Sequence, residues 1–380
     1  MDRQWNVSGG AVLGEEGFCE RSVHIAEGTI VVDGAAGARQ LDATGLLVLP
    51  GLIDIHGDAF ERQIMPRPKV VFDKGIALRD SDHQLVANGV TTAFHALTIS
   101  WEPGLRSLES ATEIVEAWKR ARPALDCDTR LHLRWETFAF NAVEQVEAWL
   151  ALDPAPILAF NDHTTSYVRK SANPKQLERI VGRTGMTREA WLELLQSIWA
   201  QRGRVPDMRR RLAEAAKSRG VVVLAHDETS PEERDLYRGL GADSSEFPLT
   251  FETAAAARQA GEHVILGAPN VVLGGSQTGA ICATEAIERR LCTVLASDYY
   301  YPALLHAPFK LADPAEPGFG AAWDLVSKHA AEAAGLPDRG ELCPGKRADL
   351  ILVDGSDRAY PSVEAVMVAG RLIYDRRGRA

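Results

Sequence analysis

Histidine and carboxylate side chains follow several apolar, β-type runs of this sequence, at the point where each run ends. The clearest case is His56-Gly57-Asp58, directly after the run at residues 52–55. Residues two apart in a strand point to the same side, so His56 and Asp58 can grip one ion together. The same pattern recurs at Glu136, Asn161-Asp162-His163, His226-Asp227-Glu228 and Ser297-Asp298.

Imidazole and carboxylate ligands suit zinc, manganese or iron. A catalytic zinc takes about three protein ligands, whereas two metals bridged by a carboxylate would use all the candidates. Such a pair lowers the pKa of a bridging water and polarises the bond that the water attacks. The last candidate could both bind a metal and accept the proton of the water. The predicted metal ligands are His56, Asp58, Glu136, His163, His226 and Asp298.

Each candidate also has a structural interpretation. A single histidine at a strand end is more often a hydrogen-bonding residue than a ligand. A lone Asp there is commonly a helix N-cap, which would explain Asp58 or Asp298, and Glu136 would then pair with Arg134 or another surface cation. The coincidence of all the candidates at predicted strand ends favours one joint site.

The middle of the chain alternates apolar runs with amphipathic stretches, which predicts strands separated by helices. Strands are expected at residues 52–55, 91–97, 130–135, 157–160, 221–225, 245–247, 264–266 and 293–296. Helices are expected at 108–120, 189–200 and 208–217, and the long connection 163–221 should carry helices over the strand ends. A doubly wound open sheet shows the same alternation, but the count of strands favours a (β/α)8 barrel, whose active sites lie at the C-terminal strand ends.

Both ends of the chain differ from the middle, with short β-type runs at residues 29–32, 46–49, 348–353 and 365–368. We expect residues 1–50 and 339–380 to form one small β-sandwich domain and residues 51–338 to form the barrel.

Composition limits the class of partner. The net charge of −10 argues against nucleic acid, which requires a basic face, but not against a small anionic substrate. The sequence shows no signal peptide and no apolar run of the roughly 20 residues that cross a bilayer. The 5 scattered cysteines, without a CxxC pair, indicate reduced thiols, and the expected location is cytoplasmic. The oligomeric state is left open, with a homo-oligomer among the alternatives.

The sequence also resembles a known family. The segments 49–56 and 344–350, LPGLIDIH and PGKRADL, are similar to two signatures that bracket the amidohydrolase superfamily. Further segments resemble its PhnM branch, whose members are α-D-ribose 1-methylphosphonate 5-triphosphate diphosphatases. These are residues 65–70, 131–136, 246–248, 267–276 and 297–300.

This resemblance implies two divalent metals. His56 and Asp58 would take one ion and His163 and His226 the other, with Glu136 bridging them. Asp298 would bind the first ion and act as general base, while water attacks the α-phosphorus and releases pyrophosphate. The cations that the resemblance places near the polyphosphate are Arg67, Lys69, Arg134, Arg169 and Lys170; ordinary surface charge is the alternative.

The sequence departs from the pattern of the branch at Gly57, His95, Leu273, Gln277 and Ala280. It also puts His163 and His226 after the fourth and fifth expected strands, where the superfamily uses the fifth and sixth. A second hypothesis therefore keeps the metals but changes the bond, to an amide, cyclic amide or amidine. A third, a binding or scaffold protein with an inactive site, is disfavoured by the intact ligand set.

Overall fold

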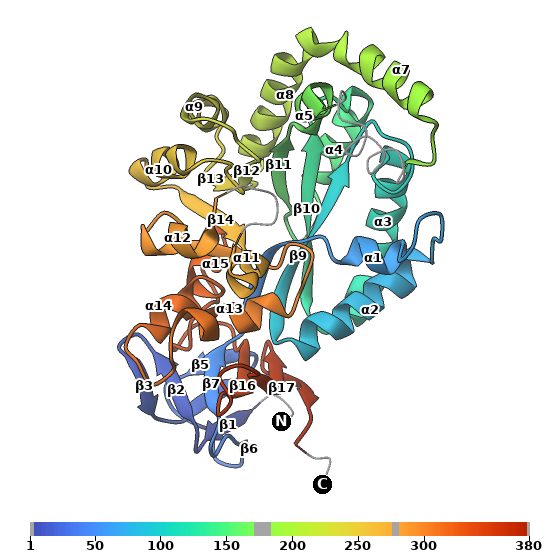
Figure 1. Cartoon of the computed structure of the whole chain (residues 1–380). Coiled ribbons are helices and arrows are strands. Elements are labelled where there is room, and N and C mark those ends of the chain that lie inside the picture. Colours follow the sequence, from blue (N-terminus) through green and yellow to red (C-terminus); the bar gives the residue numbers. More distant parts are fainter. Residues whose placement is uncertain (1–3, 171–183, 276–280, 378–380) are drawn as a thin grey trace.

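The structure is a computed structural model that describes residues 4–170, 184–275 and 281–377. Figure 1 shows a barrel surrounded by helices, with a smaller all-β part below it to which both ends of the chain contribute. Among the described residues, no helix is both long enough and apolar enough to cross a membrane.

The barrel consists of eight parallel strands that lie side by side in chain order. Every position of the second strand is buried, as expected where both faces of a parallel sheet are covered. All eight expected strands are present, and the (β/α)8 prediction is confirmed. The strands are β8 (Leu52–Gly57), β9 (Val90–Ile99), β10 (Asp128–Glu136), β11 (Ile157–Asn161), β12 (Val223–His226), β13 (Ser244–Glu246), β14 (His263–Gly267) and β15 (Val294–Ala296).

A seam between β8 and β15 closes the barrel, and the bonds across it come from the strand ends. The amide of Asp58 donates to the carbonyl of Asp298 at 2.8 Å, and the amide of Asp298 donates to the carbonyl of His56 at 2.9 Å. Deeper in the barrel, the buried carboxylate of Asp54 on β8 accepts hydrogen bonds from the amide and the hydroxyl of Ser297, at 2.9 and 2.5 Å. The backbone groups of three candidate metal ligands, His56, Asp58 and Asp298, therefore form the hydrogen bonds that close the barrel.

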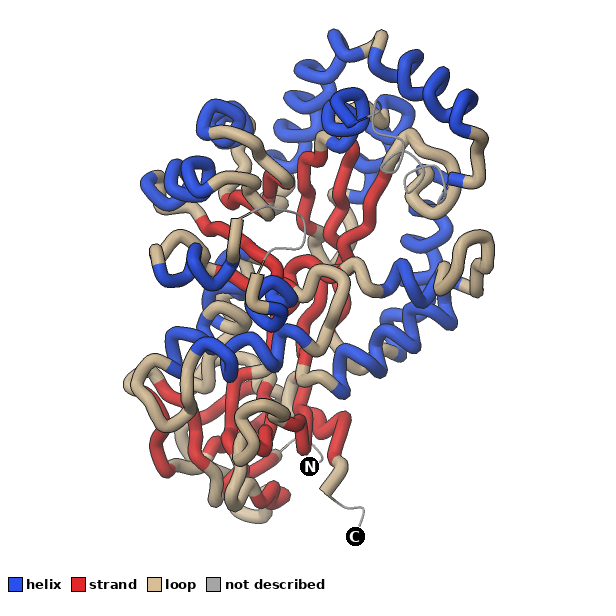
Figure 2. The backbone as a smooth tube through the Cα atoms, viewed as in Figure 1, coloured by secondary structure: helices blue, strands red, loops and turns tan. Residues whose placement is uncertain are grey.

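Helices cover the outside of the barrel (Figure 2). The three helices expected from the sequence correspond to α3, α7 and α8, and the long connection 163–221 carries α5, α7 and α8. The helices are α1 (Phe60–Ile64), α2 (Lys74–Ala87), α3 (Leu108–Ala121), α4 (Val143–Trp149), α5 (His163–Lys170), α7 (Arg188–Trp199), α8 (Val205–Ser218), α9 (Pro231–Gly239), α10 (Phe251–Gln259), α11 (Ala268–Leu273), α12 (Ala283–Glu288), α13 (Ala303–Leu311), α14 (Phe319–Asp324) and α15 (Lys328–Ala333).

The β part is a sandwich of a four-stranded and a six-stranded sheet, ordered β5-β4-β1-β6 and β18-β17-β16-β7-β2-β3. In β16, Leu350 and Leu352 pack in the core shared with the small sheet, whereas Ile351 and Val353 pack against the barrel side. This alternation is the period-2 pattern of a strand buried on both faces. The strands are β1 (Trp5–Ser8), β2 (Ala11–Gly14), β3 (Gly17–Glu20), β4 (Val23–Ala26), β5 (Thr29–Val31), β6 (Arg39–Asp42), β7 (Leu47–Pro50), β16 (Leu350–Asp354), β17 (Ser362–Val368) and β18 (Arg371–Asp375).

Candidate metal centre

The first group of possible ligands lies at the seam of the barrel. His56 lies at the end of β8, Asp58 directly follows that strand, Asp298 follows β15, and one ligand atom from each lies within 4.8 Å of the others. The N-cap position of α1 is Ala59, without a side-chain hydrogen bond, so Asp58 is not the helix cap that the alternative interpretation required. These three side chains can hold one metal ion together.

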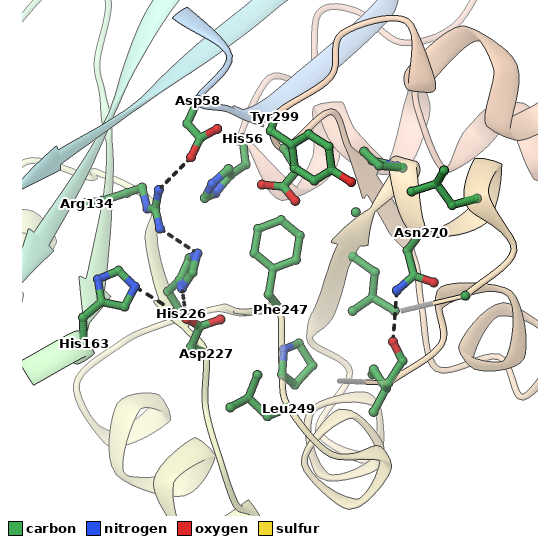
Figure 3. Close-up of a pocket in the computed structure, with 18 of the residues that line it drawn as sticks. His56, Asp58, Arg134, His163, His226, Asp227, Phe247, Leu249, Asn270 and Tyr299 are labelled. Atoms are coloured by element: carbon green, nitrogen blue, oxygen red, sulfur yellow. Dashed lines mark hydrogen bonds and ion pairs between the residues drawn. The ribbon is translucent and has the colours of Figure 1, made fainter. Parts of the chain in front are cut away.

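A second group comes from the fourth and fifth strands. His163 begins α5 directly after β11, and His226 ends β12. Asp227 lies between the two rings, with Oδ2 3.5 Å from Nε2 of His163 and 3.3 Å from Nδ1 of His226 (Figure 3). No further strand lies between β10 and β11 in the described residues, so the two histidines keep the strand positions counted from the sequence.

Glu246, at the end of β13, lies between the two groups. Its Oε1 is 2.8 Å from Nδ1 of His56, and its Oε2 is 3.9 Å from Nε2 of His226. The side chains of Glu246 and His56 are 0% and 1% exposed. With His56 and His226 it forms a third group of possible ligands, which joins the other two into one continuous site.

Burial sets the protonation of the histidines. Burial, with Arg134 and His226 nearby, holds the pKa of His56 well below 6.5. Burial also lowers the pKa of His163 to about 4, although Asp227 opposes that shift. Both rings are therefore neutral near pH 7, which is the form of imidazole that binds metals. The donor set of neutral imidazoles and carboxylates fits zinc, manganese or iron.

The carboxylates of the two groups differ in pKa. Burial and the neighbouring Glu61 raise the pKa of Asp58 to about 7, and burial raises that of Asp298. Burial also acts on Asp227, but its contacts with the imidazoles of His226 and His163 prevail and hold its pKa well below 3.8. In the protein alone, Asp227 therefore stays ionised, whereas Asp58 is partly protonated near pH 7 and a bound cation would displace that proton.

Two arginines lie beside the ligand groups. Arg134, on β10, donates from Nη2 to Nε2 of His226 at 3.1 Å and has Nη1 3.7 Å from Oδ2 of Asp58. The residue is only 4% exposed, and its Nε has no hydrogen-bond partner among the described residues. Arg106, from the loop before α3, is held by both carboxylate oxygens of Glu61 and has Nη2 3.8 Å from Oδ2 of Asp58.

Glu136 ends β10 and accepts hydrogen bonds from the start of α5. Its carboxylate binds the amides of His163 and Thr164 at 3.0 and 3.2 Å and the hydroxyl of Thr164 at 2.8 Å. Among the described residues Glu136 pairs with His163, whose Nδ1 lies 3.5 Å from Oε2, and not with Arg134, which removes the interpretation of this residue as an Arg134 partner. Here Glu136 fixes the helix that presents His163, and its role as a bridging ligand stays a prediction.

The site opens into a cavity of about 580 Å³ at the carboxyl ends of the strands. Arg106 and Arg134 line one side, and Phe247, Leu249 and Leu273 are among the apolar residues of the wall. Of the cations predicted to bind substrate, Arg134 lies in this wall. The residues Arg67, Lys69 and Arg169 are exposed and outside the wall, and the side chain of Lys170 lies outside the described part of the structure.

The departures from the family pattern have different positions. A Cβ on Gly57 would lie 2.5 Å from Oδ2 of Asp54, so that space is already filled. His95 is 1% exposed, packs with its ring 5.0 Å from that of Phe60, and is not part of the cavity wall. Leu273 lies in the cavity wall, whereas Gln277 and Ala280 are outside the described residues.

Three residues of the site, Glu246, Asp227 and Arg106, were not among the predicted site residues. Glu246 could have been found, because a glutamate that ends a buried strand faces the site by the same rule that selected His226. Asp227 follows His226 directly and turns toward it through a left-handed backbone, with φ 59°. Arg106 lies in a loop, where sequence gives no indication of side-chain direction.

Comparisons with known proteins place the chain in a family. No family model matches it. It is 33% identical over 342 residues to the α-D-ribose 1-methylphosphonate 5-triphosphate diphosphatase of Escherichia coli strain K12, covering 88% of this chain and 90% of that enzyme. The chain belongs to this diphosphatase family of the amidohydrolase superfamily.

Solved amidohydrolase structures share the fold of this family member at low identity. The dihydropyrimidinase of Brevibacillus agri matches 98% of this chain and 95% of its own, with a TM-score of 0.64 and 15% identity. An adenosine deaminase of Xanthomonas campestris with bound zinc matches 98% of this chain and 93% of its own, with a TM-score of 0.63 and 14% identity. The protein is thus a metal-dependent hydrolase on a (β/α)8 barrel with an attached β-sandwich.

Proposed function

We propose that the protein is a two-metal diphosphatase that cleaves the α–β anhydride of a ribose 5-triphosphate phosphonate and releases pyrophosphate. The family relationship supports this substrate class, and the observation that carries it is Arg134. A buried guanidinium has five N–H donors, and leaving them unpaired is costly. Arg134 makes one side-chain hydrogen bond within the described residues, to His226, and lies in the cavity wall with Nη1 3.7 Å from Oδ2 of Asp58. A phosphoryl group supplies the missing acceptors.

The proposed ligand assignment follows the two outer groups. His56, Asp58 and Asp298 would hold one divalent ion, and His163, His226 and Asp227 the other. When bound, such ions lower the pKa of a water molecule and polarise the bond that the water attacks.

The protein side chains supply the remaining steps. Asp298, whose φ of 55° turns it at the end of β15, accepts a proton from the attacking water at its carboxylate. Arg134 holds a non-bridging oxygen of the α-phosphoryl group and stabilises the charge that develops there. Arg106, kept in place by Glu61, is positioned to bind a second phosphoryl oxygen. Pyrophosphate is the leaving group, and a 5-phosphate remains.

A second candidate, hydrolysis of a cyclic amide or amidine, is favoured by the apolar part of the cavity. Phe247, Leu249 and Leu273 offer a surface for a planar ring, and the adenosine deaminase and dihydropyrimidinase are structural neighbours. This candidate leaves Arg134 without a ligand acceptor, so we rank it second.

The deciding experiment compares substrate classes on one metal-loaded preparation. Pyrophosphate release from ribose 5-triphosphate esters is measured beside hydrolysis of dihydropyrimidines, hydantoins and aminopurines. We expect pyrophosphate release, with kcat/KM reduced about 10- to 100-fold in Arg134→Met, from the loss of a charge-assisted hydrogen bond of about 1.5–3 kcal/mol.

Arg120→Met is the matched control, because Arg120 is an exposed cation on α3 away from the cavity. Faster turnover of a ring amide than of any triphosphate, or equal kcat/KM in Arg134→Met and Arg120→Met, would reject the diphosphatase assignment.

A further inference from the structure

We infer that Glu246 is a positioning residue, which fixes the tautomer of His56 so that Nε2 is its metal-binding atom. The inference rests on the metal-binding part of the proposed function and not on the identity of the substrate. The six predicted ligands do not include Glu246, and the resemblance of residues 246–248 to the family assigns it no role.

The contact between the two side chains sets the position of one proton. Oε1 of Glu246 lies 2.8 Å from Nδ1 of His56, in a pair that is essentially inaccessible to water. An imidazole that binds a metal is neutral and carries its proton on one nitrogen only, and a carboxylate can only accept that proton. His56 therefore donates from Nδ1, which leaves the lone pair of Nε2 free to bind an ion.

The second oxygen of Glu246 leaves His56 as the hydrogen-bond partner of this side chain among the described residues. Oε2 is buried and has no hydrogen-bond partner among the described residues. Nε2 of His132 lies 3.7 Å from Oε2 and Nε2 of His226 lies 3.9 Å from it, and Nδ1 of His132 donates to the carbonyl of Ile55 at 3.0 Å. That bond uses the Nδ1 proton of His132, and 3.7 Å is too long for a hydrogen bond between its Nε2 and Glu246.

The residue that follows Glu246 holds the same imidazole from another direction. Phe247 has a left-handed backbone, with φ 53°, and its ring centroid lies 4.9 Å from that of His56 and 5.3 Å from that of His226. Both contacts are edge-to-face, at 75° and 79°. The end of β13 thus fixes both the orientation and the proton of His56, which a metal site requires of its surroundings.

The test is Glu246→Gln, which keeps the shape of the side chain and removes its charge. Zinc and cobalt(II) affinity are measured with a competing chelator, without substrate. In Glu246→Gln we expect the Kd of the ion that His56 binds to rise about 10- to 100-fold, as when other hydrogen-bond partners of metal-bound histidines are replaced. The cobalt(II) absorption band should keep its intensity, because no ligand is lost.

The tautomer is read directly from ¹⁵N-histidine spectra of the zinc-loaded wild-type protein, with His56→Gln used for assignment. We expect a proton on Nδ1 of His56. A proton on Nε2, a Glu246→Gln affinity equal to wild type, or a cobalt(II) band that reports the loss of a ligand would each overturn the positioning role. The last result would make Glu246 a ligand itself.

Glu228→Gln is the matched control. Glu228 is also 0% exposed, lies beside the end of β12, and accepts hydrogen bonds from the hydroxyl of Ser245 and from Arg234. Although Glu228 follows Asp227 in the chain, its carboxylate is bound by Arg234 and Ser245 and belongs to none of the three ligand groups, so metal affinity of this variant should stay within roughly two-fold of wild type. Since metal titration needs no substrate, a failed pyrophosphate assay leaves this test intact, and the reverse also holds.

Discussion

Replacing Gly57 by alanine should destabilise the protein at the barrel seam. A Cβ there would lie 2.5 Å from Oδ2 of Asp54, 3.0 Å from Oγ of Ser297 and 3.1 Å from Cε1 of Tyr301. The first distance is shorter than any ordinary contact, so a neighbour must move. Asp54 cannot do so freely, because it is 0% exposed and its carboxylate accepts from Ser297 and from the amide of His56.

The expected magnitude follows from two contributions. Overpacking in a filled interior costs about 1–3 kcal/mol. Displacing a carboxylate from a charge-assisted hydrogen bond adds about 1.5–3 kcal/mol if the bond is lost, and less if it only lengthens. We therefore expect Gly57→Ala to lower the free energy of unfolding by about 2–5 kcal/mol. Zinc affinity should also fall, because Asp54 holds the backbone of His56 and Ser297, next to Asp298.

The assay is urea unfolding of metal-free protein, followed by tryptophan fluorescence, with zinc titration alongside. Gly239→Ala is the control, because Gly239 lies in α9 and a Cβ there meets no heavy atom within 4 Å. That variant should be as stable as wild type or gain up to about 1 kcal/mol. If Gly57→Ala unfolds at the wild-type urea concentration and binds zinc equally well, the steric explanation of this glycine is incorrect.

Three further changes test other parts of the site. Asparagine tolerates the left-handed backbone at position 298, so Asp298→Asn should keep its metal but lose at least ~10²-fold in kcat. Near-normal turnover would rule out Asp298 as the general base. Glu136→Gln replaces the carboxylate that accepts hydrogen bonds from the start of α5. The free energy of unfolding of the metal-free protein in urea should therefore fall by about 1–2 kcal/mol, and an unchanged midpoint would contradict this role. Burial lowers the pKa of His95 from 6.5 to about 4, so the unfolded chain takes up that proton first and stability falls as the pH drops between these values. His95→Gln should therefore lose about 2 kcal/mol less than wild type between pH 8 and pH 5, and equal losses would contradict a neutral buried ring.

The barrel was accessible from sequence because its strands are buried on both faces and appear as apolar runs between helices. The same property located His56, His226 and Asp298, since a residue that ends such a run must face the catalytic end of the barrel. Glu246 was missed because β13 is the short polar segment Ser-Ser-Glu, and the expected strand extended through Phe247. The sequence shows a strand end well where an apolar run stops at a charge, and poorly where the strand itself is polar.

The cations around the cavity were predicted less well than the metal ligands. Arg67 and Lys69 follow the first strand closely, yet the chain turns between them, with φ 66° at Lys69 and a bridge between Arg67 and Val70. That turn leaves both side chains exposed. Arg106 lies 48 positions after Asp58 in the sequence, and its ion pair with Glu61 holds it at the site. Such long-range pairs are set by tertiary packing and leave no local pattern.

Because the candidate ligands lie on both sides of the seam between β8 and β15, a bound metal would also affect how the chain folds. The ring closes only when Asp54 meets Ser297, 243 positions away, which is a slow search along the chain. Under the proposed ligand assignment, an ion shared by His56 and Asp298 would act as a removable cross-link around that loop, comparable to a disulfide. Because only the closed ring presents both ligands, metal supply during synthesis would stabilise the completed barrel by mass action. Chelation should then first expose the amides of Asp58 and Asp298 to hydrogen exchange, with the sandwich still protected.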